Sequence, residues 1–386
     1  MGRELRTKYL FCALQPRGAL SSLTVMPTKT KYWLLLMLPL LATRLAHAEP
    51  YFAVQTGLKC SACHVNPTGG GMRTTFGSLW GQTTLPANTL KMTEAPFTGE
   101  ISRYFALGAN LRADATVSDT PDTATRSSFD LNSLRLYGEL RAIPGRLSIY
   151  FDERLAPGGA NNAEAYVLYR TADQRYYAKA GQMYLPFGLR LQDNGAYIRE
   201  QTGISFLTPD RGVELGFDGT HWTAQIAVSN GTAGGPEVDG GKQWSLRTEY
   251  VQSRWRAGAS FNYNDFDIGS RRMQNLFAGL RTGPVSWLAE ADYIVEESQL
   301  PRRETWAGLL EANWMLHKGH NLKLTAEHLD PKGGTIKDQQ VRLSVVYEYT
   351  PLPFVQLRAG ARNYDDQREI DYLNQRILFL QVNGFF

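Results

Sequence analysis

Apolar and polar residues alternate along most of the chain after residue 99. Between residues 340 and 350, for example, Val341, Val345 and Tyr349 share one face of an extended chain, while Arg342 and Glu348 share the other. Alternation with a period of two predicts β-strands that have one apolar and one polar face. The sequence contains about sixteen such segments, at 101–116, 128–143, 145–155, 163–171, 174–184, 211–218, 220–229, 243–252, 254–264, 271–282, 284–297, 303–317, 319–329, 337–350, 353–363 and 373–386.

The connections between these segments alternate between tight turns, such as 143–145 and 282–284, and loops that are mostly longer, the longest being 185–210. An even number of strands, with short turns at one end and longer loops at the other, is typical of outer-membrane β-barrels. The chain ends on Phe385 and Phe386, and its 19 Tyr and 8 Trp residues would form interfacial girdles. We therefore predict an all-β fold, a transmembrane antiparallel β-barrel of about 16 strands over residues 99–386.

A soluble β-sandwich or propeller is the alternative fold, since its strands also alternate. The sequence has no repeat of blade length, and the asymmetry between turns and loops favours a closed barrel. Extraction of the protein into buffer without detergent would rule the barrel out.

Residues 1–48 have the features of a leader with a signal peptide. Lys29 and Lys31 precede a short apolar core at 33–41, and residues 46–48 read Ala-His-Ala, a cleavage site of the A-x-A type. We expect the mature protein to begin at Glu49, and translation to start at Met26, because residues 1–25 make the basic region unusually long. The leader holds seven of the 41 Lys and Arg residues and one of the 37 acidic residues, so the mature chain has a net charge of about −2. This balance gives no support to nucleic-acid binding.

The residues with the clearest chemistry lie between the leader and the predicted barrel. Cys60, Cys63 and His64 form the sequence C-x-x-C-H, the attachment signature of a c-type haem. Two thiols at this spacing can form thioether bonds to the two vinyl groups of one haem, and the adjacent imidazole then binds the iron as its proximal ligand. Residues 49–98 are therefore predicted to be a short monohaem c-type cytochrome segment that holds one haem c.

Three other uses of the two cysteines agree less well with the sequence. A structural zinc site needs four nitrogen or sulfur ligands, and the only other cysteine, Cys12, is removed with the leader. A thioredoxin-like site is expected beside a βαβ unit, whereas residues 65–71 have the composition of a loop. A disulfide between Cys60 and Cys63 is the main alternative, although it would not need His64.

The motif does not determine the sixth ligand of the iron. Met72 follows His64 by eight residues, and a methionine ligand would raise the reduction potential. By strand parity His221 and His317 face the lumen beside short turns. Met72, His221 and His317 are therefore the candidates, and an open or water-bound iron is the alternative. An even strand number places the haem segment at the short-turn end, which is periplasmic, either below the barrel or inside it as a plug.

A block of about 25 residues carries a resemblance to a known group of proteins. The block contains Gln55, Thr56, Gly57, the C-x-x-C-H motif, Pro67, Phe76 and Gly77, and a barrel follows it. In this order it resembles the outer-membrane monohaem cytochrome-porin fusions of iron-oxidising and related bacteria. The resemblance implies haem attachment at Cys60 and Cys63, His64 as axial ligand, and electron transfer across the outer membrane with Fe(II) as the usual donor. The glycine run at 69–71 and the porin-like stretch at 184–189 depart from the pattern, so iron oxidation stays open.

Together, these features predict an outer-membrane c-type cytochrome that moves electrons between the periplasm and an extracellular donor or acceptor such as iron. Its partners would be outer-membrane lipid, a periplasmic electron-transfer protein, and extracellular metal ions or an extracellular cytochrome. One haem cannot bridge an apolar band about 25 Å tall, so either the donor enters the lumen or a partner cytochrome docks. Whether the protein acts as an enzyme, for example in Fe(II) oxidation, is left open by the sequence.

The alternative function is a solute porin in which the haem segment is a plug or a redox-sensitive gate. Parity places both acidic and basic side chains in the lumen, so the sequence indicates no simple cation funnel. No Ser, His and Asp arrangement typical of a hydrolase can be placed on the predicted strands. The lumen-facing acids are Glu249, Glu290, Asp292, Glu311, Glu327 and Glu348, and the arginines are Arg135, Arg141, Arg247, Arg342, Arg358 and Arg362.

Overall fold

A computed structural model describes residues 49–89, 96–121, 123–298, 302–332, 339–366 and 374–386. The predicted leader at 1–48, with the proposed start at Met26, lies outside these residues, as does part of the predicted boundary between the haem segment and the barrel. Within the described ranges, no helix combines the length and the apolar character needed to cross a lipid bilayer.

Sixteen antiparallel strands form a closed barrel. Each strand pairs with its neighbours in the sequence, and the last strand pairs with β2, with Leu380 opposite Ala115, which closes the ring. The predicted fold is therefore confirmed. The strands are β2 (Phe105–Asp119), β3 (Arg126–Ile143), β4 (Leu147–Ala156), β5 (Asn161–Arg170), β6 (Tyr176–Met183), β7 (Asp210–Asp218), β8 (Trp222–Ser229), β9 (Gln243–Val251), β10 (Trp255–Phe266), β11 (Gly269–Thr282), β12 (Val285–Glu296), β13 (Arg303–His317), β14 (His320–Lys332), β15 (Gln340–Leu352), β16 (Val355–Asp366) and β17 (Gln375–Phe385).

The first predicted strand, 101–116, is in fact two strands. A three-residue strand, β1 (Glu100–Ser102), pairs with the start of β2 across a tight turn at residues 103–104. The side-chain oxygen of Ser102 accepts hydrogen bonds from the backbone N–H groups of Tyr104 and Phe105, both at 3.2 Å, and so stabilises the turn. Because Ile101 and Phe105 on either side of the turn keep the alternation of a single strand, the sequence pattern does not reveal it.

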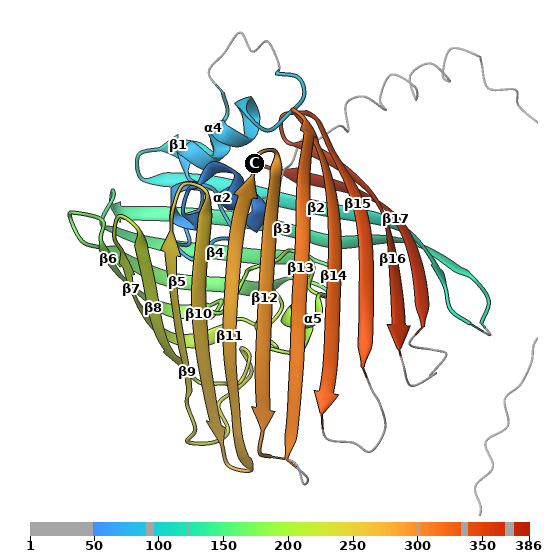
Figure 1. Cartoon of the computed structure of the whole chain (residues 1–386). Helices are drawn as coiled ribbons and strands as arrows, with labels where there is room; N and C mark the ends of the chain where they lie inside the picture. Colours follow the sequence, from blue (N-terminus) through green and yellow to red (C-terminus); the bar gives the residue numbers. More distant parts are fainter. Residues whose placement is uncertain (1–48, 90–95, 122, 299–301, 333–338, 367–373) are drawn as a thin grey trace, which may run out of the picture. The chain divides into compact units, whose positions relative to one another are not determined.

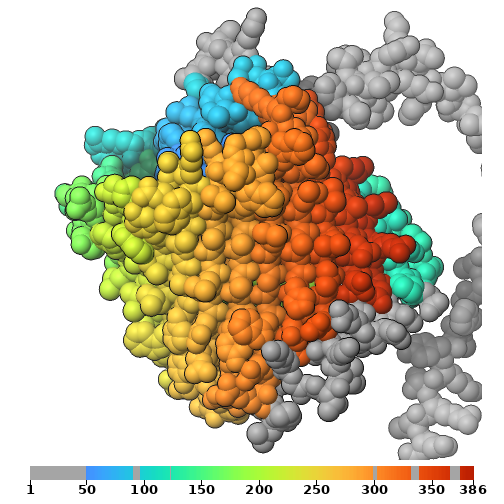
Figure 2. Space-filling model, in the orientation of Figure 1, coloured from blue at the N-terminus to red at the C-terminus, as the bar shows by residue number. Residues whose placement is uncertain are grey.

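The barrel wall is apolar outside and polar inside. Leu343 and Val345 are 52% and 49% exposed, whereas Arg342 and Glu348 on the opposite face of β15 are each only 1% exposed. Figure 2 shows that the wall formed by the yellow to red strands is continuous over this outer face. An apolar exterior around a charged interior is the arrangement of a barrel that lipid surrounds.

The residues ahead of the barrel form three short helices at the end where the short turns and the C terminus lie (Figure 1). They are α2 (Pro50–Thr56), α3 (Cys60–Cys63) and α4 (Thr75–Thr83). Helix α2 has Pro50 in its first turn and ends at Gly57, which adopts a left-handed backbone with φ of 69°. Helix α4 is capped by Thr74, whose side chain accepts the N–H of Gly77. From here on, the name haem segment is used for residues 49–89, the part of the predicted segment 49–98 that contains these helices.

The longest connection, residues 184–209 between β6 and β7, folds back into the barrel, and we call it the lumen loop. It contains the single helical turn α5 (Tyr197–Glu200). Backbone N–H groups of Leu189 and Tyr197 donate to the carboxylates of Glu290 on β12 and Glu327 on β14. The haem segment and the lumen loop share one apolar cluster with the wall, formed by residues that include Tyr51, Phe52, Leu189, Ile198, Phe277 and Leu288.

Candidate haem-binding site

The two cysteines and the histidine of the C-x-x-C-H motif lie together on helix α3. The helix is a single turn, which places Cys60 and Cys63 on the same side. The backbone N–H of His64 donates to the carbonyl oxygen of Cys60 at 2.9 Å, so the imidazole follows directly on the turn. Both cysteines are half-buried free thiols, and together with His64 they line a cavity of about 80 Å³. The structure therefore brings the predicted attachment residues together.

Apolar side chains of the haem segment and the lumen loop form much of this cavity, and charged side chains, among them Arg73, Arg247 and Glu249, complete it. Phe52 of α2, Trp80 of α4, Leu85 and Leu189 of the lumen loop line it, and the rings of Phe52 and Trp80 are 5.1 Å apart. Pockets that hold organic cofactors are largely apolar, with a few polar groups that fix the ligand. The surroundings of the two thiols share this apolar character, but the cavity of about 80 Å³ is smaller than such pockets, which hold about 300–1,000 Å³.

The glycine run at 69–71 has a steric explanation. All three residues have positive φ angles, of 91°, 81° and 64°, which other residues rarely adopt. A Cβ atom on Gly69 would lie 3.4 Å from the sulfur of Cys60, and one on Gly70 would lie 2.6 Å from the ring of Phe206. On Gly71 it would overlap the hydroxyl of Tyr150. The run thus lets the chain pass close to both the motif and the lumen loop.

His64 is buried and pairs with Arg73 in a short antiparallel bridge. Burial, with smaller contributions from Arg73 and Arg190, lowers the pKa of His64 to about 3. The imidazole is therefore neutral at pH 7, which is the form that binds metal. Its Nδ1 atom has no hydrogen-bond partner among the described residues, and a buried polar atom in this position normally has one. Burial also raises the pKa of the Cys63 thiol.

The donor set and its surroundings fit a covalently attached haem. The two thiols face one cavity, the adjacent imidazole is neutral with an unsatisfied nitrogen, and the glycine run leaves space beside Cys60. Bound there, the haem would be held by Cys60 and Cys63 as thioethers and by His64 as axial ligand. A zinc site fits less well, since no group of three or more His, Cys, Asp or Glu side chains placed to hold a metal occurs in the described ranges.

Polar contacts hold the haem segment inside the mouth of the barrel. Lys59 forms an ion pair of 2.7 Å with Asp218 at the turn between β7 and β8. On the opposite wall, Glu49 pairs with Arg358 of β16 at 2.8 Å, and the hydroxyl of Tyr51 donates to Glu348 of β15 at 2.6 Å. These lumen-facing partners show that the segment is a plug and does not hang below the barrel.

The three candidates for the sixth iron ligand lie in different places. Met72 is buried in a cluster with Val65 and Tyr150, and its backbone pairs with Val65, so it lies on the other face of the bridge from His64. His221 is exposed, its Nδ1 lies 3.0 Å from the carbonyl oxygen of Val251, and it lines, together with His64, a wide cavity of about 1180 Å³ at the mouth.

His317 is exposed at the end of β13, with its ring 6.4 Å from that of His320. It does not line the described cavities that contain His64. The structure thus brings only His221, of the three candidates, to a described cavity shared with His64.

Arg190 of the lumen loop is a site residue that the sequence analysis missed. Its guanidinium donates to the carbonyl oxygen of Gly69 at 2.8 Å and lies over the rings of Tyr184 and Phe206. It therefore joins the lumen loop to the haem segment directly behind the motif. The unusual length of residues 184–209 was the available signal, since long connections without a strand are commonly functional.

Comparison with known proteins supports the fold and leaves the site untested. No protein-family model matches the sequence, and no curated protein matches it. Solved structures similar to this chain include an anion-selective porin from Comamonas acidovorans (10% identity, TM-score 0.57), which covers 73% of this chain and 99% of its own. The outer membrane channel DcaP of Acinetobacter baumannii (13%, 0.58) covers 73% and 97%, and OprB of Pseudomonas putida (8%, 0.57) covers 74% and 94%. The chain therefore has the barrel fold of bacterial outer-membrane porins.

Proposed function

We propose that this protein is an outer-membrane c-type cytochrome in which one covalently bound haem lies in the periplasmic mouth of a porin-like barrel. The observation that carries the proposal is the position of Cys60, Cys63 and His64 on one helical turn inside that mouth. The apolar exterior and the fold that the chain shares with outer-membrane porins support the location. The short-turn end, where the haem segment lies, is periplasmic in such barrels.

The chain's own residues would prepare the site for one-electron chemistry. The haem, when bound, supplies reversible electron exchange. His64 acts as the proximal ligand, and its burial keeps water from competing for the imidazole. Arg73 and Arg190 add positive charge beside it, which favours the reduced form of the site and raises its potential. His221 is the distal candidate that the cavity shared with His64 supports best, with Met72 and His317 kept as the alternatives.

The site would exchange electrons with two kinds of partner. A periplasmic electron-transfer protein would dock on the mouth, where the cavity of about 1180 Å³ opens beside Ser61 and His64. An extracellular metal ion or an extracellular cytochrome would approach from the side of the long loops. This proposal requires electrons to pass through a lumen that the haem segment and the lumen loop partly fill.

The attachment can be tested directly. The full chain, produced in cells that mature c-type cytochromes, should carry one haem that stays bound on a denaturing gel. The double substitution Cys60→Ser with Cys63→Ser should abolish this haem while heat-dependent gel mobility still reports a folded barrel. Ser61→Ala, within the same turn, is the matched control and should keep the haem. An unmodified wild-type chain, or haem retained in the double variant, would refute the proposal.

A solute porin with a haem-bearing plug is the second candidate. The cavities on both sides of His64 favour it, since they leave water-accessible space in the lumen, and the similar structures are described as porins and channels. Conductance in a planar bilayer, measured before and after reduction, separates the two functions. A large conductance that reduction does not change favours plain transport, and a closed barrel whose haem is oxidised or reduced by soluble metal favours electron transfer.

A further inference from the structure

A second cavity, of about 360 Å³, lies on the lumen side of His64, and we call it the chamber. Its walls come from β2, β3 and β13–β17, from residues 191–196 of the lumen loop, and from Gly70, Gly71 and Arg73 of the haem segment. The size is in the range of small-ligand sites. Because His64 and Arg73 line both this chamber and the cavity of the two cysteines, the two spaces adjoin.

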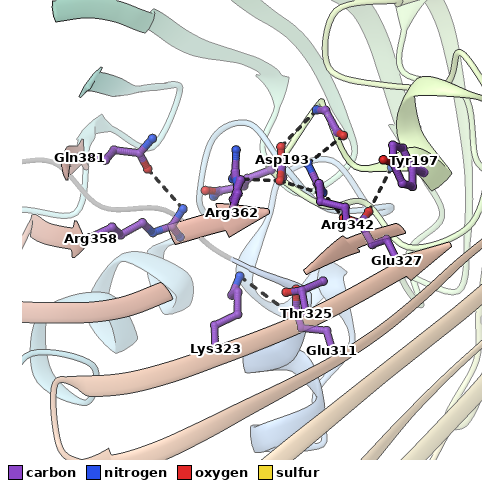
Figure 3. Close-up of polar contacts among 12 residues, drawn as sticks. Asp193, Tyr197, Glu311, Lys323, Thr325, Glu327, Arg342, Arg358, Arg362 and Gln381 are labelled. Atoms are coloured by element: carbon purple, nitrogen blue, oxygen red, sulfur yellow. Dashed lines mark hydrogen bonds and ion pairs between the residues drawn. The ribbon is translucent and has the colours of Figure 1, made fainter. Parts of the chain in front are cut away.

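Positive side chains outnumber negative ones around the chamber. The carboxylates are already shared between cations: Asp193 lies 3.0 Å from Arg342 and 2.9 Å from Arg362 (Figure 3). Arg358 and Lys323 likewise share Glu49 and Glu348. An excess of positive charge around a concave space attracts anions. The lining contains Arg73, Arg112, Arg135, Arg154, Arg342, Arg358, Arg362 and Lys323, against Glu49, Asp114, Asp193, Glu311 and Glu348.

Several polar atoms on the chamber wall have no hydrogen-bond partner among the described residues. Two of them are donors, the hydroxyl of Ser344, which is 7% exposed, and Nε of Arg362; others are Nδ1 of His64 and Oδ1 of Asn194. Ser344 and Arg362 are direct partners on β15 and β16, so their side chains are neighbours on the lumen face. Buried polar groups in proteins nearly always have a partner. A hydroxyl next to a guanidinium N–H forms a pair of donors suited to an oxygen anion.

We propose that the chamber is a binding site for carboxylate groups, with Arg362 and Ser344 as the direct donors and Arg112 as the further positive charge. A guanidinium group presents its N–H donors in a rigid fork that matches the two oxygens of a planar carboxylate. Such carboxylates have two sources. One is the propionate edge of the haem, opposite its thioether edge, and this source rests on the proposed function. The other is a small polycarboxylate, free or as a metal chelate, that enters from the side of the long loops.

If the occupant is a small polycarboxylate or its metal chelate, the chamber also determines which class of redox partner reaches the haem. The same excess positive charge that binds a polycarboxylate repels a free divalent cation. The chamber would therefore admit iron as an anionic chelate, and a free Fe(II) ion would be disfavoured. Selectivity of this kind depends on the chamber alone, so it can be measured with or without a haem.

Citrate is the probe, and calorimetric titration of the full chain in detergent is the measurement. Citrate should bind to the haem-loaded protein, to the Cys60→Ser/Cys63→Ser variant, or to both. Binding to both identifies the free polycarboxylate as the occupant, and binding only to the haem-free variant identifies the propionates. Absence of binding in both overturns the proposal. If wild-type protein carries no haem but binds citrate, the proposed function fails while the chamber stands.

Point variants assign the donors. Arg362→Gln, which leaves Asp193 paired with Arg342, should weaken citrate binding about tenfold, and Ser344→Ala about threefold. Arg302→Gln removes the same charge from an exposed position at the start of β13 and is the matched control, with binding unchanged. Equal weakening by Arg302→Gln and Arg362→Gln would contradict the site. If the double cysteine variant does not assemble, a lower midpoint potential in haem-loaded Arg362→Gln supports propionate contact. The proposal is overturned if the protein shows no citrate binding and the midpoint potential does not change.

Discussion

The haem segment and the lumen loop both fill the barrel, but different parts of the chain hold them in place. The haem segment is attached to the wall through its side chains, as in the pairs of Lys59 with Asp218 and of Glu49 with Arg358, and also through backbone groups such as the carbonyl of Gln55. The lumen loop is attached largely through its backbone, as in the N–H of Leu189 that donates to a wall carboxylate. Substitutions of single residues should therefore release the first more easily than the second.

Connectivity adds to this difference. The haem segment continues into the barrel at only one end, through β1, whereas the lumen loop is bounded on both sides by barrel strands. Closing a loop at both ends limits how far it can move. The two inserts meet where Arg190 donates to Gly69 and where Phe206 packs against Gly70. The segment that carries Cys60, Cys63 and His64 is thus less constrained by the chain than the lumen loop that it contacts.

The largest effect should come from removing the haem segment. Deletion of residues 50–89 takes away the helices that contact the short turns around the mouth, so single-channel conductance in a planar bilayer should rise severalfold. Deletion of residues within the lumen loop is the comparison, and should change conductance less while the mouth stays closed. Unchanged conductance after the first deletion would mean that the lumen loop alone closes the barrel.

Arg358→Gln and Arg342→Gln separate the supports of the two inserts. Each removes one of the two cations that hold a carboxylate of an insert. Because Lys323 still pairs with Glu49 and Arg362 still pairs with Asp193, the cost should be below the value of about 3–5 kcal/mol for an unpaired buried charge. Arg358 pairs with Glu49 of the haem segment, and Arg342 pairs with Asp193 of the lumen loop. Limited proteolysis in detergent should show release of the haem segment only in the first variant and of the lumen loop only in the second. Release of both inserts by either variant would show that they move as one unit.

Gly77→Ala tests the contact between α4 and the C-x-x-C-H turn. The added Cβ would overlap the carbonyl oxygen of Cys63, so α4 must shift, at a cost of about 1–3 kcal/mol. We expect a lower yield of covalent haem and a lower thermal midpoint. Gly81→Ala on the same helix is the matched control, since its Cβ would lie 3.3 Å from a ring carbon of Phe385. Equal effects of the two substitutions would contradict a specific role for Gly77.

The smallest effect should be a pH dependence of the lumen loop. Burial alone would raise the pKa of Asp193, but Arg362 and Arg342 together hold it below its ordinary value. A carboxylate with a lowered pKa contributes its full stability above its unfolded pKa of about 3.9, and this contribution is lost as the pH falls toward the folded value. The protection factors of the loop amides, which are exchange rates corrected for the intrinsic pH dependence of exchange, should therefore be the same at pH 7 and pH 5 and fall only below about pH 4. Asp193→Asn should remove this dependence, and loosening between pH 7 and pH 5 would rule out Asp193 as its cause.

Much of the wall could be predicted because each strand has one face toward lipid and one toward the lumen. The predicted strand 303–317 coincides with β13 (Arg303–His317), and parity placed Arg342 and Glu348 inside, where they are buried. The prediction was wrong at 101–116, because the turn after Ser102 is held by a side-chain hydrogen bond that leaves the alternation unchanged. The alternation of apolar and polar residues predicts which side chains are buried, but it does not predict where the chain turns back.

The sequence alone determined the barrel and the chemistry of the attachment motif, because both depend on residue type at fixed short spacing. Period-two alternation needs only neighbouring residues, and C-x-x-C-H needs only five. The tertiary structure alone decided that the segment carrying Cys60 is a plug, that Gly69 needs the freedom of glycine, and that Arg362 and Ser344 face one chamber. These arrangements join residues that lie up to about 300 positions apart, such as Glu49 and Arg358, and they depend on how the closed ring orients its interior. Charge pairing across a lumen has no local signature in a sequence, since each partner alone reads as one more polar residue on an alternating strand.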